Sequence, residues 1–232
     1  MSLLRETGKT AVAIGSTGLV GTRLLRRLLE DPRYRQVVAI ARREPELKHP
    51  KLKTMIADFE RLEELDLRAE APDDWFCALG TTIKKAGSQE AFRRVDYDYP
   101  LAFGRLAQKY GAKRYLMVSA LGSSAESRIF YSRVKGEIER DLADLGLPEL
   151  SIFQPSLLLG ERREFRLGER IAAVLMPALK PVFTGPLRKI RAVKGDEVAA
   201  AMIAVANSPM QGPVRRVRND EIQRLAGSRV EA

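Results

Sequence analysis

The sequence contains only one cysteine, Cys77, and one histidine, His49, among its 232 residues. A single cysteine excludes an internal disulfide and a cysteine-based metal cluster, and a single histidine excludes a histidine-rich metal site. Cys77 lies in an apolar stretch, so we interpret it as a small buried side chain rather than a nucleophile. His49, next to Pro50, is expected in a surface loop. We therefore expect no metal site and no histidine-based acid–base chemistry.

Long hydrophobic runs are also missing. No apolar stretch reaches the roughly 18 residues that a membrane-spanning helix needs, so no transmembrane segment is expected. The first residues, MSLLRETGKT, are too few and too polar to form a secretory signal. The default expectation from these two absences is a cytoplasmic protein.

Basic residues outnumber acidic ones, 40 against 30, which gives a net charge of +10. Such a balance is compatible with nucleic-acid, membrane-surface or anionic small-molecule binding. The charge is nevertheless spread along the chain, and no aromatic residues interleave its denser stretches as stacking platforms would. A solvated charged surface is therefore favoured over a nucleic-acid partner. The denser stretches contain Arg162, Arg163, Arg166, Arg170, Arg215, Arg216 and Arg218.

Short apolar runs alternate with helical patterns along most of the chain. This alternation predicts an α/β fold with a doubly wound parallel sheet, in which ligands bind beyond the carboxyl ends of the strands. One expected helix contains Pro100, which must lie in a first turn or cause a kink. Strands are expected at 10–14, 36–41, 53–57, 75–79, 114–119 and 150–154, and helices at 18–31, 92–110, 131–145 and 195–207.

A glycine-rich turn joins the first expected strand to the first expected helix. It reads Gly15-Ser16-Thr17-Gly18-Leu19-Val20-Gly21. Glycines permit a tight turn, a close approach of phosphate to the backbone, and close packing of the helix on the strand. The helix N-terminus adds N–H donors and a partial positive charge. These residues predict a pyrophosphate site for a dinucleotide, with a purely structural turn as the alternative.

The second expected strand ends at Ala41-Arg42-Arg43, with no acidic residue before Glu44. An NAD site places a carboxylate about 20 residues after the glycines to bind the ribose hydroxyls, whereas a 2′-phosphate needs cations. A guanidinium binds a phosphate through two parallel hydrogen bonds. Arg42 and Arg43 therefore predict NADP(H) rather than NAD(H), unless they are only solvated surface residues.

Three further strand ends carry polar motifs that could contact the same cofactor. A carboxylate could accept from the adenine amino group, a glycine lets backbone approach a ribose or nicotinamide, and the last turn would border the nicotinamide ring. Ordinary loop or turn residues are the alternative at each place. The motifs are Asp58-Phe59, Leu79-Gly80-Thr81-Thr82 and Gln154-Pro155-Ser156.

These motifs suggest how the chain is organised. We expect a single NAD(P)-binding domain over residues 1–232, with a cofactor-binding core in 1–155. The region 156–232 is expected to form a small substrate or cap region, with a closing helix, as an appendage over the ligand edge of the sheet.

Tyr131 and Lys135 are four residues apart at the start of an expected helix, so they share one helix face. Tyrosine acts as a general acid or base only if its pKa falls from about 10 toward neutrality, and a nearby ammonium lowers that pKa. Ser119, at the end of the preceding strand, offers a hydroxyl for the same substrate oxygen. Because this spacing is common by chance, the argument rests on its location; a surface tyrosine is the alternative.

The order of the glycine turn, Ser119, Tyr131, Lys135 and Pro155 resembles the short-chain dehydrogenase/reductase superfamily, in its extended or atypical branch. Residues 10 to 205 are, more narrowly, similar to the small atypical group typified by the mammalian Tat-interacting oxidoreductase. The motifs of that group are Leu79-Gly80-Thr81-Thr82, Lys85-Ala86-Gly87, Phe92-x-x-Val95-Asp96-x-Asp98-Tyr99 and Val134-Lys135-Gly136-Glu137-Ile138-Glu139.

This resemblance implies a Rossmann-like fold, NADPH binding and a catalytic set. In that set Tyr131 passes a proton to or from the substrate oxygen and Ser119 orients that oxygen. Lys135 lowers the tyrosine pKa and holds the nicotinamide ribose. One residue departs from the pattern: extended members often carry asparagine where this sequence has Asp96, and a carboxylate cannot donate a hydrogen bond as an amide does.

Two hypotheses follow. The first is an NADPH-dependent oxidoreductase that reduces a carbonyl-type small molecule by hydride transfer, with Tyr131 as general acid. The second is a non-catalytic NADPH-dependent redox sensor or regulatory scaffold that binds a protein partner. Nucleic-acid binding ranks a distant third.

Overall fold

The chain is described here from a computed structural model, which covers residues 8–159 and 191–227. Arg162, Arg163, Arg166 and Arg170 lie outside these residues. The elements in chain order are β1 (Lys9–Ile14), α1 (Leu19–Glu30), β2 (Tyr34–Ala41), β3 (Leu52–Ile56), the 3₁₀ segment η1 (Phe59–Glu64), β4 (Asp74–Cys77), α2 (Ile83–Ala86), α3 (Gln89–Arg93), the π-helical turn η2 (Arg94–Asp98), α4 (Tyr99–Lys109), β5 (Arg114–Val118), α5 (Phe130–Ala143), β6 (Leu150–Gln154), β7 (Leu158–Leu159), β8 (Val193–Lys194), α7 (Gly195–Ala206), β9 (Val214–Arg218) and α8 (Asn219–Gly227).

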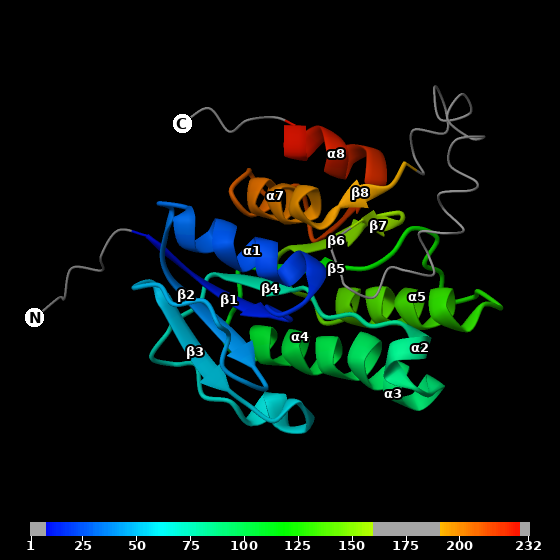
Figure 1. Cartoon of the computed structure of the whole chain (residues 1–232), viewed down its shortest axis with the longest axis horizontal. Coiled ribbons are helices and arrows are strands. Elements are labelled where there is room, and N and C mark those ends of the chain that lie inside the picture. The colour runs from blue at the N-terminus through cyan, green and yellow to red at the C-terminus, as the bar shows by residue number, and fades with distance from the viewer. Residues whose placement is uncertain (1–7, 160–190, 228–232) are drawn as a thin grey trace, which may run out of the picture.

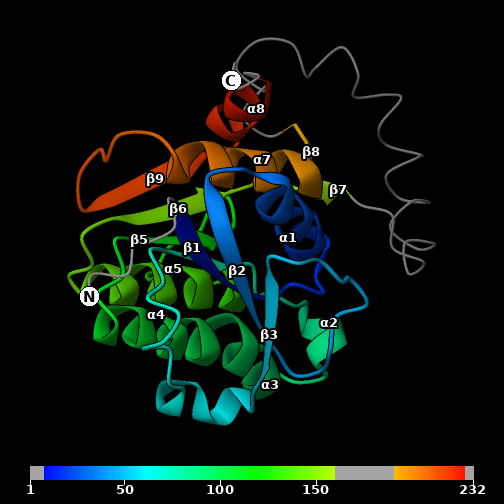
Figure 2. The ribbon, with the colours of Figure 1, turned by 90° about the vertical axis from the view of Figure 1, so that its left-hand side faces the viewer.

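Seven strands form one sheet in the order β3-β2-β1-β4-β5-β6-β9, and every neighbouring pair runs parallel. The chain proceeds from β1 to one edge and then from β4 to the other, so the strand order reverses between β1 and β4. Ligands of such sheets bind at this reversal, beyond the carboxyl ends of the strands. The predicted doubly wound α/β fold is confirmed (Figures 1 and 2).

Helices cover both faces of the sheet. α1 and α7 lie on one face, while α4 and α5 lie on the other (Figure 1). The central strands are therefore buried on both sides and read as continuous apolar runs, as in KTAVAI of β1 and the VVAIA end of β2. Two separate apolar cores result, one on each face of the sheet.

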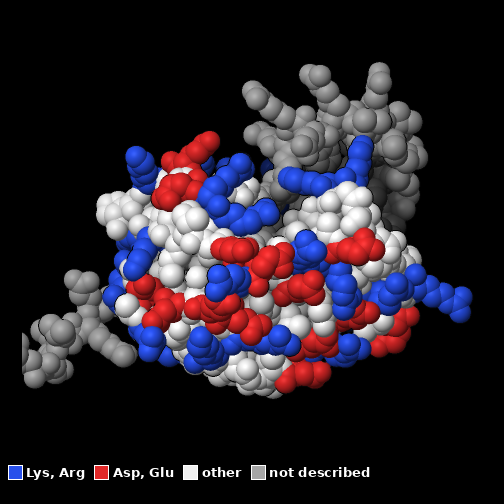
Figure 3. Space-filling model, turned by 90° about the horizontal axis from the view of Figure 1, so that it is seen from below, with Lys and Arg blue, Asp and Glu red and all other residues white. Residues whose placement is uncertain are grey.

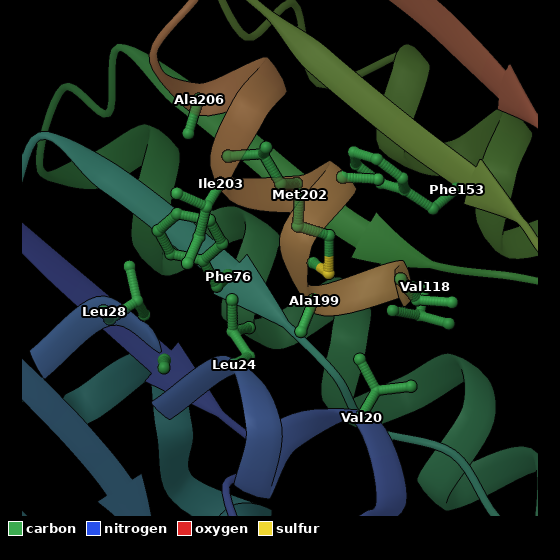
Figure 4. Close-up of a cluster of buried hydrophobic side chains, with 14 of the residues drawn as sticks. Val20, Leu24, Leu28, Phe76, Val118, Phe153, Ala199, Met202, Ile203 and Ala206 are labelled. Atoms are coloured by element: carbon green, nitrogen blue, oxygen red, sulfur yellow. The ribbon is translucent and has the colours of Figure 1, made fainter. Parts of the chain in front are cut away.

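The core under α1 and α7 takes its side chains from both helices and from the sheet. Leu24 of α1, Met202 of α7 and Phe76 of β4 belong to this core, and all three are fully buried (Figure 4). Small residues of α7, such as Ala199, let the two helices approach closely. α7 thus completes the helical layer that α1 begins.

β9 was not expected from the sequence. Its residues, VRRVR, include three arginines, so the apolar pattern of a buried strand is absent. It nevertheless pairs in parallel with β6 as the seventh strand. Because β9 extends the main sheet and α7 packs on α1, the described part of the chain after residue 190 is joined to the core at more than the ligand edge.

The helix expected over 92–110 consists of three consecutive segments, α3, η2 and α4. Pro100 lies in the first turn of α4, as predicted, where its missing N–H leaves no hydrogen bond unmade. The π-helical turn before it carries Asp96. Such turns are rare and occur often at functional sites.

Figure 3 shows the face of the molecule that points downward in Figure 1. Acidic and basic side chains are intermixed on this face, and neither kind forms a large separate patch. Of the helices that the structure describes, none has the length and hydropathy that crossing a membrane requires.

Candidate active site

The glycine turn lies where β1 meets α1, beside the end of β4. Gly15 has φ of +85°, and a Cβ on it would lie 2.6 Å from the Ala78 carbonyl. A Cβ on Gly21 would lie 2.0 Å from the Gly15 oxygen. Gly15 and Gly21 are thus required by the contact between β1, α1 and β4. These two glycines have a structural reason to be here whether or not a ligand binds.

The N-terminus of α1 is suited to an anion. Its N-cap, Gly18, has no side chain to satisfy the first N–H groups, and its first turn holds no acidic residue. Ser16 is buried, yet its hydroxyl has no hydrogen-bond partner among the described residues. An unpaired buried hydroxyl beside open helix N–H groups fits a phosphate oxygen. The turn therefore fits the pyrophosphate predicted for it.

The other residues of this turn are placed differently from one another. Thr17 is exposed and Leu19 is half-buried, with its backbone against Gly195 at the start of α7. Val20 is buried in the core under α7. Only the backbone of Val20 is available to a ligand.

Arg42 and Arg43 are both exposed just beyond β2. The Arg42 guanidinium lies 5.6 Å from the centre of the Phe59 ring, and Phe59 itself is buried and packs edge-on against Tyr99. Asp58 accepts a hydrogen bond from the Glu60 N–H and so caps η1. Phe59 therefore acts as a platform that restrains Arg42, while Arg43 has no such support among the described contacts.

The loop after β4 contains Leu79, Gly80, Thr81 and Thr82. The Thr81 N–H donates to Asp96 Oδ2 at 2.9 Å, and Thr82 caps α2 by accepting from the Lys85 N–H. Gly80 is exposed, and a Cβ there would face Asp96 at 3.5 Å. The loop is thus held against η2 by Asp96.

Lys135 and Asp96 form a buried ion pair, with Nζ 2.8 Å from Oδ1. Burial alone would lower the pKa of Lys135, but Asp96, with smaller contributions from Tyr131 and Cys77, outweighs it, so the pKa lies above its ordinary value. Tyr131, one turn earlier on α5, is half-buried and packs on Phe92 with ring centres 5.5 Å apart. Tyr131 and Lys135 share one helix face, and the ammonium is held in its charged form beside the tyrosine.

Ser119 lies just past β5 and is buried. Its hydroxyl donates to Glu139 Oε1 at 2.6 Å. The Glu139 carboxylate also accepts from the Gln154 amide at 2.9 and 3.0 Å and from Arg216 Nε at 3.3 Å. Three donors converge on one buried carboxylate, which fixes Ser119 and Gln154 at the carboxyl ends of β5 and β6.

The Pro155-Ser156 turn is tied to neighbouring loops. The Pro155 carbonyl accepts from the Leu121 N–H. Ser156 donates its N–H to Asn219 and its hydroxyl to the Arg191 carbonyl. The two donors of Ser156 thus join this turn to Asn219 at the start of α8 and to Arg191.

Glu139 and Arg216 were missed by the sequence analysis as parts of this site. Glu139 lies four residues after Lys135 and eight after Tyr131, so the same periodicity that joined those two also marks Glu139. Arg216 lies on the unexpected strand β9, and no local pattern connects it to Ser119.

A parallel α/β sheet with this turn, helix and strand-end arrangement defines a dinucleotide-binding fold of the short-chain dehydrogenase/reductase type. Residues 15–145 match the family described as NAD(P)H-binding, and the chain belongs to that family. Protein HTATIP2 of Rattus norvegicus is 36% identical over 167 residues, which cover 71% of this chain and 69% of the relative. The mitochondrial protein FMP52 of Candida albicans is 33% identical over 191 residues, covering 76% and 83%. The resemblance inferred from the motifs is confirmed.

Solved structures agree on the fold. An oxidoreductase of the short-chain dehydrogenase/reductase family from Burkholderia thailandensis superposes with a TM-score of 0.68 at 16% identity, covering 94% of each chain. MoeE5 in complex with UDP-glucuronic acid and NAD superposes with a TM-score of 0.67 at 14% identity, covering 90% of this chain and 76% of MoeE5. At these identities the likeness concerns the fold alone.

The cytoplasmic location expected from the sequence is corrected by these relatives. Several of them, from Candida albicans, Scheffersomyces stipitis and Emericella nidulans, are named as mitochondrial proteins. The expectation rested on two absences, and neither a missing secretory signal nor a missing spanning helix would distinguish the cytoplasm from an organelle.

Proposed function

We propose that this protein is an NADPH-dependent oxidoreductase that reduces a carbonyl-type small molecule, with Tyr131 as general acid. The observation that carries the proposal is the placement of Tyr131 beside a buried, charged Lys135 at the carboxyl edge of the sheet. Ser119 lies at the same edge of the sheet, directly after the end of β5. The region from residue 156 onward is proposed to complete the substrate side.

Each residue of the set has a distinct task in this proposal. The nicotinamide of the cofactor, when bound, supplies the hydride. Tyr131 donates its phenolic proton to the substrate oxygen, and Lys135 stabilises the phenolate that remains. The open N–H groups of α1 and the Ser16 hydroxyl bind the pyrophosphate. The Gly80 and Gln154-Pro155-Ser156 loops border the ribose and ring.

The test of this activity is hydride transfer across a panel of carbonyl compounds, followed by NADPH absorbance. Tyr131→Phe keeps the ring that packs on Phe92 and removes only the hydroxyl, so we expect turnover to fall about 100-fold or more. Tyr97→Phe is the matched control, because Tyr97 bonds Asp141 on the helix surface. Unchanged turnover in Tyr131→Phe would refute the role of Tyr131.

The preference for NADP(H) over NAD(H) is proposed from Arg42 and Arg43. Both guanidinium groups are exposed at the end of β2, and the Phe59 ring supports the first. Arg42→Ala is expected to weaken NADPH binding about tenfold or more while leaving NADH affinity unchanged, because only the 2′-phosphate contact is lost. Isothermal titration with both nucleotides measures this ratio, and equal losses for the two would contradict the assignment.

One observation favours the second function, an NADPH-dependent sensor or scaffold for a protein partner. The only proton of the Ser119 hydroxyl is donated to Glu139, so Ser119 must turn away from Glu139 before it can donate to a carbonyl oxygen. If NADPH binds in titration and no carbonyl compound in the panel turns over, this second function is favoured.

A further inference from the structure

Among the aspartate–lysine ion pairs of the described residues, Asp96–Lys135 is the most completely shielded from water. Its side chains are 1% and 5% exposed. The Asp73–Lys113 pair has a similar separation, 2.7 Å, but the lysine is 70% exposed. A buried pair contributes little net stability, because desolvation offsets the attraction. Stability alone therefore does not explain why a buried ion pair lies in the candidate site.

The backbone around Asp96 is built to bring its carboxylate to this place. Asp96 lies in the π-helical turn η2, which packs against both α4 and α5. Its two oxygens are divided between two parts of the site. Oδ1 pairs with Lys135 on α5, and Oδ2 accepts the Thr81 N–H in the loop after β4.

We propose that Asp96 is a positioning residue that fastens Lys135 and the Thr81 loop to each other and balances the charge of the ammonium. Its catalytic consequence rests on the reductase function proposed above, whereas the pairing itself does not. An asparagine at this place would keep the shape and one acceptor oxygen but would supply no charge. Asp96, where extended members often carry asparagine, thus adds a negative charge beside Lys135 that an amide would not supply.

The groups around Lys135 support this assignment. Asp96 faces it from η2, Tyr131 from α5 and the Cys77 thiol from β4. Burial lowers the pKa of Lys135, and Asp96 is the largest influence that raises it. Without Asp96, burial would prevail and the ammonium would lose its proton at a much lower pH.

The experiment follows the lysine side chains directly, by NMR titration of protein labelled with ¹³C at lysine Cε. Lys135→Met identifies the Lys135 signal. In Asp96→Asn we expect that signal to titrate about two pH units or more below its wild-type value. Asp73→Asn is the matched control, because it removes the carboxylate from an ion pair of the same residue types whose lysine, Lys113, is 70% exposed. A Lys135 signal that titrates alike in wild type and Asp96→Asn would overturn the proposal.

Unfolding measurements keep the proposal testable if Asp96→Asn folds poorly. Each single variant, Asp96→Asn or Lys135→Met, leaves one buried charge unpaired, while the double variant leaves none. We expect the double variant to unfold at a higher urea concentration than either single variant. Additive losses would show that the two side chains do not depend on each other.

Turnover adds an arm that separates the two proposals. If the reductase function holds, the alkaline limb of kcat/KM should shift down by about two pH units in Asp96→Asn. The reaction needs protonated Lys135, and in this variant the lysine loses its proton at a lower pH. If wild type turns nothing over but the Lys135 signal shifts as expected, the reductase function fails and the positioning role stands.

Discussion

At the scale of single residues, the hydrogen bond from Ser119 to Glu139 decides which further hydrogen bonds the serine can make. A carboxylate only accepts hydrogen bonds, so three donors converging on Glu139 are all satisfied. Serine has one proton, and Glu139 receives it. The Ser119 oxygen can then still accept a hydrogen bond, but it has no proton left to donate.

The prediction from this arrangement concerns Glu139→Gln. An amide has one acceptor oxygen, and its NH₂ group would face the donors of Gln154 or Arg216. We expect the free energy of unfolding to fall by about 1–3 kcal/mol, because a buried donor loses its partner. Urea denaturation measures this loss.

Glu137→Gln is the control for that variant, since Glu137 lies on the same helix. It pairs with Arg93 and Arg133, which are each about 40% exposed. Exposed pairs contribute about 0–1 kcal/mol. If both variants lose the same free energy, the Glu139 network has no special weight.

The site could be predicted from sequence only where its residues are close along the chain. The glycine turn and the Tyr131–Lys135 pair each follow from local spacing on one strand–helix unit. The Asp96–Lys135 and Glu139–Arg216 contacts join residues 39 and 77 positions apart. Such pairs depend on how the helices and strands pack, which no local pattern gives.

At the scale of secondary-structure elements, the β1–α1 turn depends on the absence of a side chain at Gly21. A Cβ there would lie 2.0 Å from a backbone oxygen, so the helix would have to move off the strand. We expect Gly21→Ala to lower the free energy of unfolding by about 1–3 kcal/mol and to weaken NADPH binding in titration. Gly227→Ala is the control, because its Cβ would meet nothing within 4 Å; an equal effect there would contradict the argument.

An ion pair and apolar contacts both join α7 to α1, and their expected contributions to the free energy of unfolding differ. Arg27 and Asp196 are 40% and 48% exposed, so Asp196→Asn should cost less than about 1 kcal/mol. Leu24 is fully buried, and Leu24→Ala should cost about 2–5 kcal/mol. Urea denaturation of the two variants tests this order, and a larger loss in Asp196→Asn would show that the pair holds the helices together.

Element prediction succeeded where the apolar pattern is decided by burial on both faces. β1 and β2 are such strands, and a short continuous apolar run rich in β-branched residues is typical of a strand buried on both faces. β9 could not be found this way, because its arginines interrupt the apolar pattern. Arg215 and Arg216 pair with Glu221 and Glu139, and Arg216 is still 49% exposed. Its strand conformation comes from pairing with β6 rather than from its own composition.

At the scale of the whole molecule, ionisable groups make stability depend on pH from both ends. Arg27 lowers the pKa of Asp196 by hydrogen bonding. Burial alone would raise the pKa of Asp31, but its bonds to Arg33 prevail and lower it. The stabilisation from these carboxylates is present above pH 3.8 and is lost as the pH falls through their lower folded values.

The alkaline end follows from tyrosines. Burial first, and then the hydrogen bond to Glu60, raise the pKa of Tyr99 from 10.0 to about 12. The folded state then keeps a proton that the unfolded chain has released, so stability from Tyr99 is complete below pH 10 and is lost between pH 10 and about 12. Burial and the Asp74 carboxylate also raise the pKa of Tyr34. We therefore expect the free energy of unfolding to be flat near neutrality and to fall above about pH 10.

Tyr99→Phe isolates one part of that alkaline fall. At neutral pH the variant lacks the hydrogen bond to Glu60 and should be less stable than wild type. Above pH 10 wild type loses the contribution of this tyrosine and the variant has none to lose, so the two unfolding free energies should converge. Urea denaturation at about pH 7 and about pH 11 measures the convergence. A constant gap between the two proteins would mean that Tyr99 keeps an ordinary pKa in the fold, and that the alkaline loss belongs to other groups such as Tyr34.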